Sequence, residues 1–123
     1  MTPERHSVVW RASTLASRAL AQSWPHGEEW KLNVAILREL RNAAAQRQVP
    51  VLFVLIPTYH WQSFPALARH LRETGADVVD LSQEPGLDMS RMYYPGDGHL
   101  NAAGHQWVSE VLVRRIRSKY PQL

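Results

Sequence analysis

Cysteine is absent from the 123-residue sequence, which excludes a disulfide framework, a thiolate metal site and a cysteine nucleophile. Long apolar runs are absent too. The longest, Val49 to Ile56, contains Pro50 and falls well short of the roughly 18 residues that a spanning helix needs. The first residues, MTPERHSVVWRAS, lack the charged, apolar and small-residue order of a signal peptide. We therefore expect no membrane partner and no export signal in this chain, and the compartment stays open.

A large excess of one charge is also missing. Lys and Arg number 14 against 11 Asp and Glu, a net charge of +3 with the six histidines neutral. Nucleic-acid binding needs cations that are clustered. At the end of the last expected helix, such cations also favour the helix dipole, so we expect no nucleic-acid partner. A basic binding module stays an alternative, carried by Arg114, Arg115, Arg117 and Lys119.

The remaining composition is that of a folded protein. Hydrophobic residues make up 45% of the chain and charged residues 20%, which gives enough apolar surface to offset the entropy of the chain. The length suits one core rather than two. We therefore predict a single domain over residues 1–123.

Helix caps and apolar residues at helical spacing predict four helices. The first begins at Thr2-Pro3 and ends before residues 23–27, and the second runs from Glu28 to about Gln48. Ser63 can cap the third, Gly75 is placed to close it, and Asn101 caps the last. The side chains expected to face inward are Trp30, Val34, Leu37 and Leu40 on the second helix, and Trp107, Val108, Val111, Leu112 and Ile116 on the last.

Two strands are expected between these helices. Residues 50–56, PVLFVLI, show no polar alternation, which is typical of a strand buried on both faces of a parallel sheet. Residues 76–81, ADVVDL, indicate a second strand, and Ser82 to Gly98 is expected to be a loop. A strand, a helix and a strand in succession favour parallel pairing. The class is therefore α/β, in the order α-α-β-α-β-loop-α.

A parallel sheet of two strands leaves two bare edges, and such edges invite pairing with other chains. Sheets average roughly five or six strands. We therefore expect this chain to be the C-terminal part of a larger α/β domain, or to have its sheet completed by a partner chain or a homo-oligomer.

Residues 93–105, YYPGDGHLNAAGH, hold the clearest chemical signal. Asp97 and His99 stand two apart, so in an extended loop their side chains point to the same side. A carboxylate that accepts a hydrogen bond from one imidazole nitrogen fixes the tautomer and stabilises the imidazolium when the other nitrogen takes a proton. Gly96 and Gly98 leave room around Asp97. The plain alternative is a turn, because Asp-Gly between prolines and glycines is a common turn signal.

The stretch DGHLNAAGH resembles the last sequence block of the SGNH, or GDSL-like, hydrolases, in particular the branch of carbohydrate O-acetyltransferases and esterases. The resemblance extends over about residues 49–118. It implies a partial three-layer α/β/α, flavodoxin-like fold with a short parallel sheet. It also implies that His99 is the general base and Asp97 its orienter, with Asn101 and Gly104 at the helix start.

The same family places its serine nucleophile in a Gly-Asp-Ser block, which this chain lacks. One residue separates Asp97 from His99, whereas two is the commoner family spacing. There is no G-x-S-x-G elbow either. Ser82 follows the second strand, but a solvent-facing loop serine is the favoured interpretation. The nucleophile is therefore expected from outside this chain.

Further candidates are weaker. Thr58, Tyr59, His60 and Trp61 follow the first strand, where ligands of open α/β sheets bind, or they pack a loop. Tyr93 and Tyr94 could stack on a sugar or anchor the loop. Asp97, His99 and His105 lack the spacing of a helical metal pair, so we expect no metal and no cofactor.

The function predicted from the residues and the resemblance together is an esterase acting on an O-acyl ester of a carbohydrate. The catalytic residues would be His99 and Asp97, and the structural support Gly96, Gly98, Asn101 and Gly104. The substrate-binding residues would be Tyr59, His60 and Tyr94. The alternatives are a non-catalytic fragment or subunit that completes the sheet of another chain, and the basic binding module.

Overall fold

The computed structural model describes residues 27–58 and 64–122. The chain divides into two compact units, Met1–Pro50 and Val51–Leu123. The described elements are mixed α/β and mostly helical: four helices and a two-stranded parallel sheet. The first expected helix, before residue 23, lies outside the described residues.

The described part of the first unit is helix α2, Glu28–Gln46, which confirms the second expected helix. Glu28 and Glu29 stand in its first turn, where carboxylates favour the positive end of the helix dipole. The expected inward face is only partly covered. Trp30, Val34 and Leu37 are half-buried, but Leu40 is 51% exposed, so its predicted burial is wrong.

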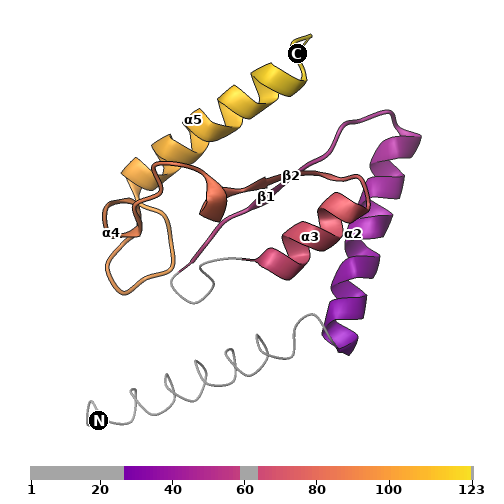
Figure 1. The fold of residues 1–123 in the computed structure, drawn as a ribbon, viewed down its shortest axis with the longest axis horizontal. Coiled ribbons are helices and arrows are strands. Elements are labelled where there is room, and N and C mark those ends of the chain that lie inside the picture. The colour runs from indigo at the N-terminus through magenta and orange to yellow at the C-terminus, as the bar shows by residue number, and fades with distance from the viewer. Residues whose placement is uncertain (1–26, 59–63, 123) are drawn as a thin grey trace. The chain divides into compact units, whose positions relative to one another are not determined.

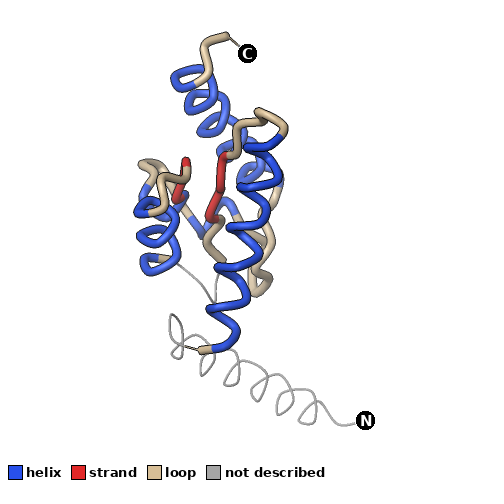
Figure 2. The backbone as a smooth tube through the Cα atoms, turned by 90° about the vertical axis from the view of Figure 1, so that its right-hand side faces the viewer, coloured by secondary structure: helices blue, strands red, loops and turns tan. Residues whose placement is uncertain are grey.

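The second unit contains the sheet, drawn in Figure 1 between α3 and α5. Strand β1, Leu52–Leu55, pairs in parallel with β2, Asp77–Asp80, which confirms the expected parallel pairing. The register sets Phe53 beside Val78 and Val54 beside Val79. Because side chains alternate between the two faces of a strand, each of these pairs lies on a different face. Figure 2 shows the two strands side by side.

Helix α5, Ala102–Lys119, covers one face of this sheet. The core on that face is made by Val79, Leu81 and Val111. The half-buried side chains packed against it confirm most of the predicted stripe, although Ile116 is exposed. They are Leu52, Val54, Trp107, Val108 and Leu112.

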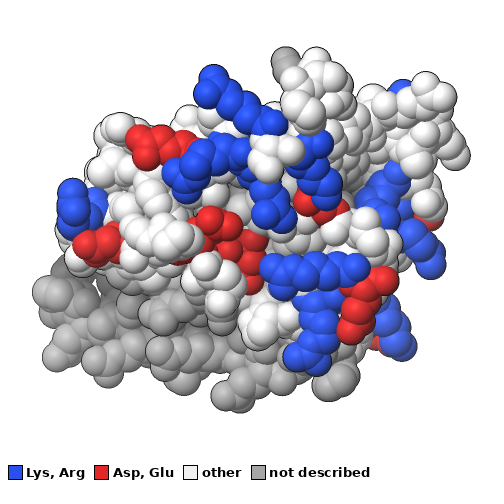
Figure 3. Space-filling view, turned by 45° about the horizontal axis from the view of Figure 1, so that its top comes forward, with Lys and Arg blue, Asp and Glu red and all other residues white. Residues whose placement is uncertain are grey.

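The C-terminal end of α5 is anchored to the start of β2 through Asp77. The Asp77 carboxylate lies 3.0 Å from Lys119 Nζ and accepts a 3.1 Å hydrogen bond from the Tyr120 hydroxyl. Burial, together with that bond and the charge of Asp77, raises the pKa of Tyr120. The Arg115 guanidinium donates to the carbonyl of Val78 at 3.4 Å. Figure 3 shows basic side chains adjoining acidic ones on the face it draws. Two of the four cations of the expected cluster are therefore engaged within the chain.

Helix α3, Pro65–Glu73, packs on β2 and buries Ala68 and Leu71. Phe64 occupies its N-cap position, whereas the expected cap, Ser63, lies outside the described residues. Gly75, with a φ of +77°, follows the last turn as predicted.

The segment expected to be a loop contains two short helical turns, so that prediction is wrong in part. A 3-10 turn spans Leu81–Gln83 and helix α4 spans Met89–Met92. Each turn is capped by an aspartate whose carboxylate accepts from the second residue on: Asp80 from the Ser82 amide and Asp88 from the Ser90 amide, both at 3.0 Å. An aspartate cap of this kind can form a single helical turn in a segment whose apolar residues do not recur at helical spacing.

Strand β1 also differs from expectation. All four of its residues are half-buried rather than enclosed on both faces, and Ile56 just after it is 41% exposed. The cause is pairing along one edge only: among residues 27–58 and 64–122, β2 is the only strand beside it.

Gly104 sets how closely α5 approaches α4. A Cβ at this buried position would lie 2.2 Å from the Met92 carbonyl oxygen and 2.7 Å from Leu100 Cδ2. The substitution Gly104→Ala should therefore lower the free energy of unfolding by about 2–3 kcal/mol, despite the better helix propensity of alanine, because the backbone of α4 must move.

Urea denaturation followed by circular dichroism measures this change. Ser109→Ala, at an exposed position of the same helix, is the matched control and should stay within about 0.5 kcal/mol of the parent. A Gly104→Ala variant as stable as the parent would show that the two helices are not in close contact here.

Candidate active site

The segment Tyr93–Asn101, here called the His99 loop, connects α4 to α5. Its two ends are paired: Tyr93 and Leu100 form an antiparallel bridge, and the Tyr94 amide donates to the His99 carbonyl at 3.1 Å. A turn closes its tip, where the Asp97 amide donates to the Tyr94 carbonyl at 3.1 Å. Gly96 has a φ of +71° and follows Pro95, as the third residue of a type II turn requires. The predicted loop glycine is therefore a conformational requirement.

Asp97 and His99 are in direct contact within this loop. The Asp97 carboxylate accepts a hydrogen bond from the His99 backbone amide at 3.0 Å, and the same Oδ1 contacts Nδ1 of the imidazole. The ring is open to solvent: the His99 side chain is 86% exposed and that of Asp97 52%. Nε2 has no hydrogen-bond partner within the described part of the chain. The nitrogen that can accept a proton, Nε2, therefore faces solvent, while Nδ1 is in contact with Asp97.

The Asp97 carboxylate is stabilised by its neighbour. The hydrogen bond from the His99 ring lowers the pKa of Asp97 below its ordinary value; desolvation opposes this, and the backbone amide and the charge of His99 add to the lowering. Asp97 therefore stays ionised at neutral pH beside the ring. An ionised carboxylate on Nδ1 is the arrangement that stabilises a proton arriving at Nε2.

The loop lies at the carboxyl end of β1. Tyr93 is buried, and its hydroxyl donates a hydrogen bond to the carbonyl of Pro57, 36 residues earlier in the chain. Nearby, a Cβ on Gly98 would lie 3.6 Å from Cβ of Thr58. These two contacts hold His99 at the edge of the sheet where ligands of open α/β proteins bind. Tyr93 thus anchors the loop, one of the two roles expected for it.

Asn101 and Gly104 support the loop as predicted. The Asn101 side chain accepts from the Gly104 amide at 3.0 Å and so caps α5. Gly104 is buried against α4. The sequence did not indicate that Asn101 also donates, through Nδ2, to the carbonyl of Arg91 at 2.8 Å.

Of the remaining candidate residues, the structure describes Tyr94, Ser82 and His105. Tyr94 is 54% exposed at the base of the turn. Tyr59 and His60, with Trp61, lie outside the described residues. The Ser82 hydroxyl donates to Asp80 at 2.6 Å, which makes it part of the cap of the 3-10 turn. His105 is exposed on α5, and no group of three potential metal ligands occurs in the portion of the chain that is described.

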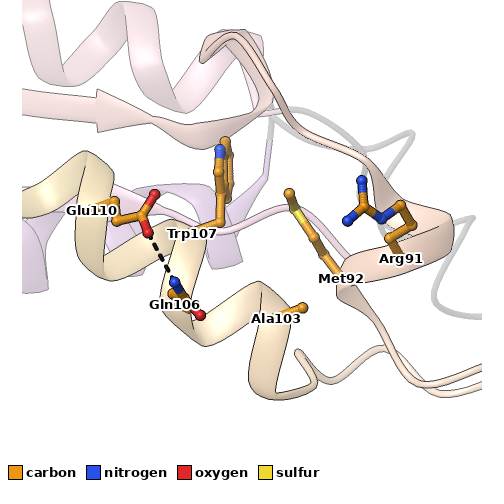
Figure 4. A pocket seen from close by; sticks show the side chains of 6 residues that line it. All are labelled: Arg91, Met92, Ala103, Gln106, Trp107 and Glu110. Carbon is orange, nitrogen blue, oxygen red and sulfur yellow. Dashed lines mark hydrogen bonds between the residues drawn. The ribbon is translucent and has the colours of Figure 1, made fainter.

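A hollow of about 240 Å³ lies between α4 and α5, next to the base of the His99 loop. Figure 4 shows Met92 and the indole of Trp107 along its length, with Arg91 at one end and Glu110 at the other. Glu110 accepts a 3.1 Å hydrogen bond from Gln106. Apolar surface from Met92 and Trp107 lines it together with polar surface, and the two charges at the ends have opposite sign. Sequence reasoning missed this hollow because α4 itself was not expected.

The Asp97–His99 contact predicts a measurable titration. In the folded protein, the Asp97 carboxyl should titrate below its ordinary pKa, so the stability that the contact contributes is present above that value and is lost as the pH falls through the lowered pKa. His99→Ala should move the pKa of Asp97 upward, though not fully, because the backbone amide remains.

Carbon-detected NMR of the side-chain carboxyl carbons over pH 2–7 follows this change. Asp88 is the internal control, since its pKa is also lowered but chiefly by the Ser90 hydroxyl. An unchanged Asp97 titration in His99→Ala, or a shift of Asp88 as well, would contradict a direct contact between the two side chains.

None of the known protein-family models, curated proteins or solved structures matches this chain. Among the described residues, no helix is both long enough and apolar enough to cross a membrane.

Proposed function

We propose that this chain contributes the general base, His99, and its orienting carboxylate, Asp97, to an ester hydrolase or acyl transferase of the SGNH type. The observation that carries the proposal is the contact of Asp97 with Nδ1 of an imidazole whose Nε2 is open to solvent. The finer fold that accompanies it is a partial three-layer α/β/α, flavodoxin-like domain. The order of β1, α3, β2 and α5 is compatible with that fold.

The proposed reaction uses a serine from outside this chain. His99 Nε2 takes the proton of the serine hydroxyl as the oxygen attacks the ester carbonyl carbon, and Asp97 stabilises the imidazolium that forms. The tetrahedral intermediate collapses, and Nε2 returns the proton to the leaving alcohol. A water, or a second alcohol in a transferase, then gives its proton to Nε2 and attacks the carbonyl carbon of the acyl-enzyme. The bond from that carbon to the serine oxygen breaks, and Nε2 returns the proton to the serine.

The position of the pair supports this role. It lies at the carboxyl end of β1, on a loop whose two ends are hydrogen-bonded to each other. A base on a loop that is already ordered loses little conformational entropy when a substrate binds. Avoiding that entropy cost is a large part of how positioning contributes to catalysis.

The proposed substrate is an O-acyl ester on a carbohydrate. Tyr94, half exposed beside the pair, offers a ring face on which a sugar can stack. The hollow between α4 and α5 adds a second aromatic surface, Trp107, with polar groups at its ends. Aromatic surface with placed polar groups beside it is a common feature of small-molecule sites.

A base and its orienter do not suffice for turnover. The nucleophile and the donors for the oxyanion supply most of the rate enhancement in acyl transfer. We therefore expect the chain alone to cleave esters negligibly, and activity to appear only when the serine-bearing segment is present.

The test is to produce the chain together with the coding sequence that precedes it, joined and as separate polypeptides, and to assay cleavage of acetyl esters. His99→Ala should lower kcat/KM by about 10³–10⁴-fold, and Asp97→Asn by a similar factor, because the tautomer is no longer held. His105→Ala, an exposed histidine on α5, is the matched control and should leave the rate unchanged.

Acetyl-ester cleavage that persists in His99→Ala would refute the assignment of the base. The absence of any His99-dependent cleavage in either preparation would refute the proposed function as a whole.

A second candidate function is favoured by one observation. Strand β1 consists of four apolar residues that are all half-buried and paired on one edge within the described structure. Unprotected apolar edges add strands from other chains. On this alternative, the chain is a non-catalytic subunit that completes the sheet of a partner.

Size-exclusion chromatography with light scattering separates the two functions at low cost. If β1 pairs with another chain, the isolated protein should self-associate, and Ile56→Lys, at the 41% exposed position just after this strand, should reduce the association. A stable monomer at concentrations of about 100 µM, well above a typical Kd for a specific interface, would remove the need for a sheet partner.

A further inference from the structure

The carboxamide of Asn101 makes contacts in two directions. Its Oδ1 accepts from the Gly104 amide at 3.0 Å. Its Nδ2 donates to the carbonyl of Arg91 at 2.8 Å and lies 3.4 Å from the carbonyl of Tyr93. The Asn101 backbone amide donates to the Met92 carbonyl at 2.9 Å. One residue thus bonds to the end of α4 and the start of α5 at the same time.

Capping explains only the acceptor side of this side chain. An N-cap needs an oxygen that accepts from the third residue on, and aspartate or serine supplies it as well as asparagine does. The contacts of Nδ2 with the carbonyls of Arg91 and Tyr93 contribute nothing to the cap of α5. Aspartate has no donor and serine has a single hydroxyl oxygen for both tasks, whereas asparagine accepts at Oδ1 and donates at Nδ2, two separate atoms.

The carbonyls that Nδ2 contacts belong to the residues where the His99 loop leaves α4, and Asn101 itself is where the loop enters α5. The side chain therefore closes the loop at its base, while the bond from Tyr94 to His99 and the turn at Asp97 order it above. Between these points stand Asp97 and His99, more than half exposed and with few other contacts.

We propose that Asn101 is a positioning residue for His99: its Nδ2 bonds to the carbonyls of Arg91 and Tyr93 hold the two ends of the His99 loop together and keep Asp97 and the imidazole in register. This rests on the proposed function in one respect only, namely that the ring held in this way is a general base. The clamp itself is a property of the chain that can be tested without any reaction.

The variants Asn101→Asp and Asn101→Ser separate the clamp from the cap. Both keep an oxygen that caps α5; aspartate has no side-chain donor, and the serine hydroxyl sits on a shorter side chain than the Nδ2 that donates to the Arg91 carbonyl. Asn101→Ala, which loses cap and clamp together, gives the purely structural reference. Two cap-retaining variants of different size keep the test independent of the folding of either one.

The first measurement needs no activity. Thermal unfolding of the Ser variant should stay close to that of the parent and above that of Asn101→Ala, whereas the Asp variant should unfold at a lower temperature than the Ser variant, because a carboxylate oxygen then faces the carbonyls of Arg91 and Tyr93. In the same two variants, the pKa of Asp97 should rise toward its ordinary value, and fast backbone motion of residues 94–99 should increase in nitrogen-15 relaxation. An Asp97 titration and loop mobility equal to those of the parent in both variants would overturn the clamp.

The second measurement uses the preparation that contains the serine-bearing segment. Displacing a base by about 1 Å costs roughly 10²-fold in rate, so kcat should fall by about that factor in both variants while KM stays the same. A rise in KM with an unchanged kcat would overturn the positioning role. If this preparation shows no His99-dependent cleavage even in the parent, the proposed function fails, and the first measurement still decides the clamp.

Discussion

The hydroxyl of buried Tyr93 donates a hydrogen bond to the carbonyl of Pro57 and so connects the His99 loop to the carboxyl end of β1, where we propose an active site. It is the contact through which the loop after α4 meets the residues that follow β1, since Pro57 lies 36 residues before Tyr93. Without it, the pair Asp97–His99 would be a turn on the surface. With it, the pair stands where parallel strands present their carboxyl ends, and Gly98 can lie against Thr58. A buried tyrosine serves well here because its ring fills the core while its hydroxyl satisfies a backbone acceptor.

Local chemistry was predictable from the sequence wherever the cause lies within a few residues. Asn101 caps α5, Gly75 follows the end of α3, and β1 pairs in parallel with β2, all as expected. The two partners of the Asp97–His99 contact could also be predicted, since they stand two residues apart, whereas the bonds that close the base of the loop around them could not. Caps, short turns and apolar runs are local causes with local effects.

Features that depend on distant residues or on very short elements were not predictable. Helix α4 has four residues, too few for any apolar period, and its aspartate cap reads equally well as a turn. The hollow next to it was missed for the same reason. The Tyr93 bond to Pro57 and the donor side of Asn101 depend on which carbonyls the fold brings near. The half-burial of β1 depends on whether another strand pairs with its outer edge, and none does among the described residues. No residue of the strand encodes that.

The exposure of the Asp97–His99 pair has a consequence for how it would work. Charges that face water interact weakly, because solvent screens them, and a carboxylate that is half exposed gives an imidazolium only modest stabilisation. The same pair becomes much more effective when a substrate or a neighbouring segment displaces that water. A base that is open in the isolated chain and enclosed in the complete site therefore fits the absence of a Gly-Asp-Ser block from this sequence. The clamp at Asn101 would keep the geometry ready, and the segment that brings the serine would supply the dry environment in which that geometry has its effect.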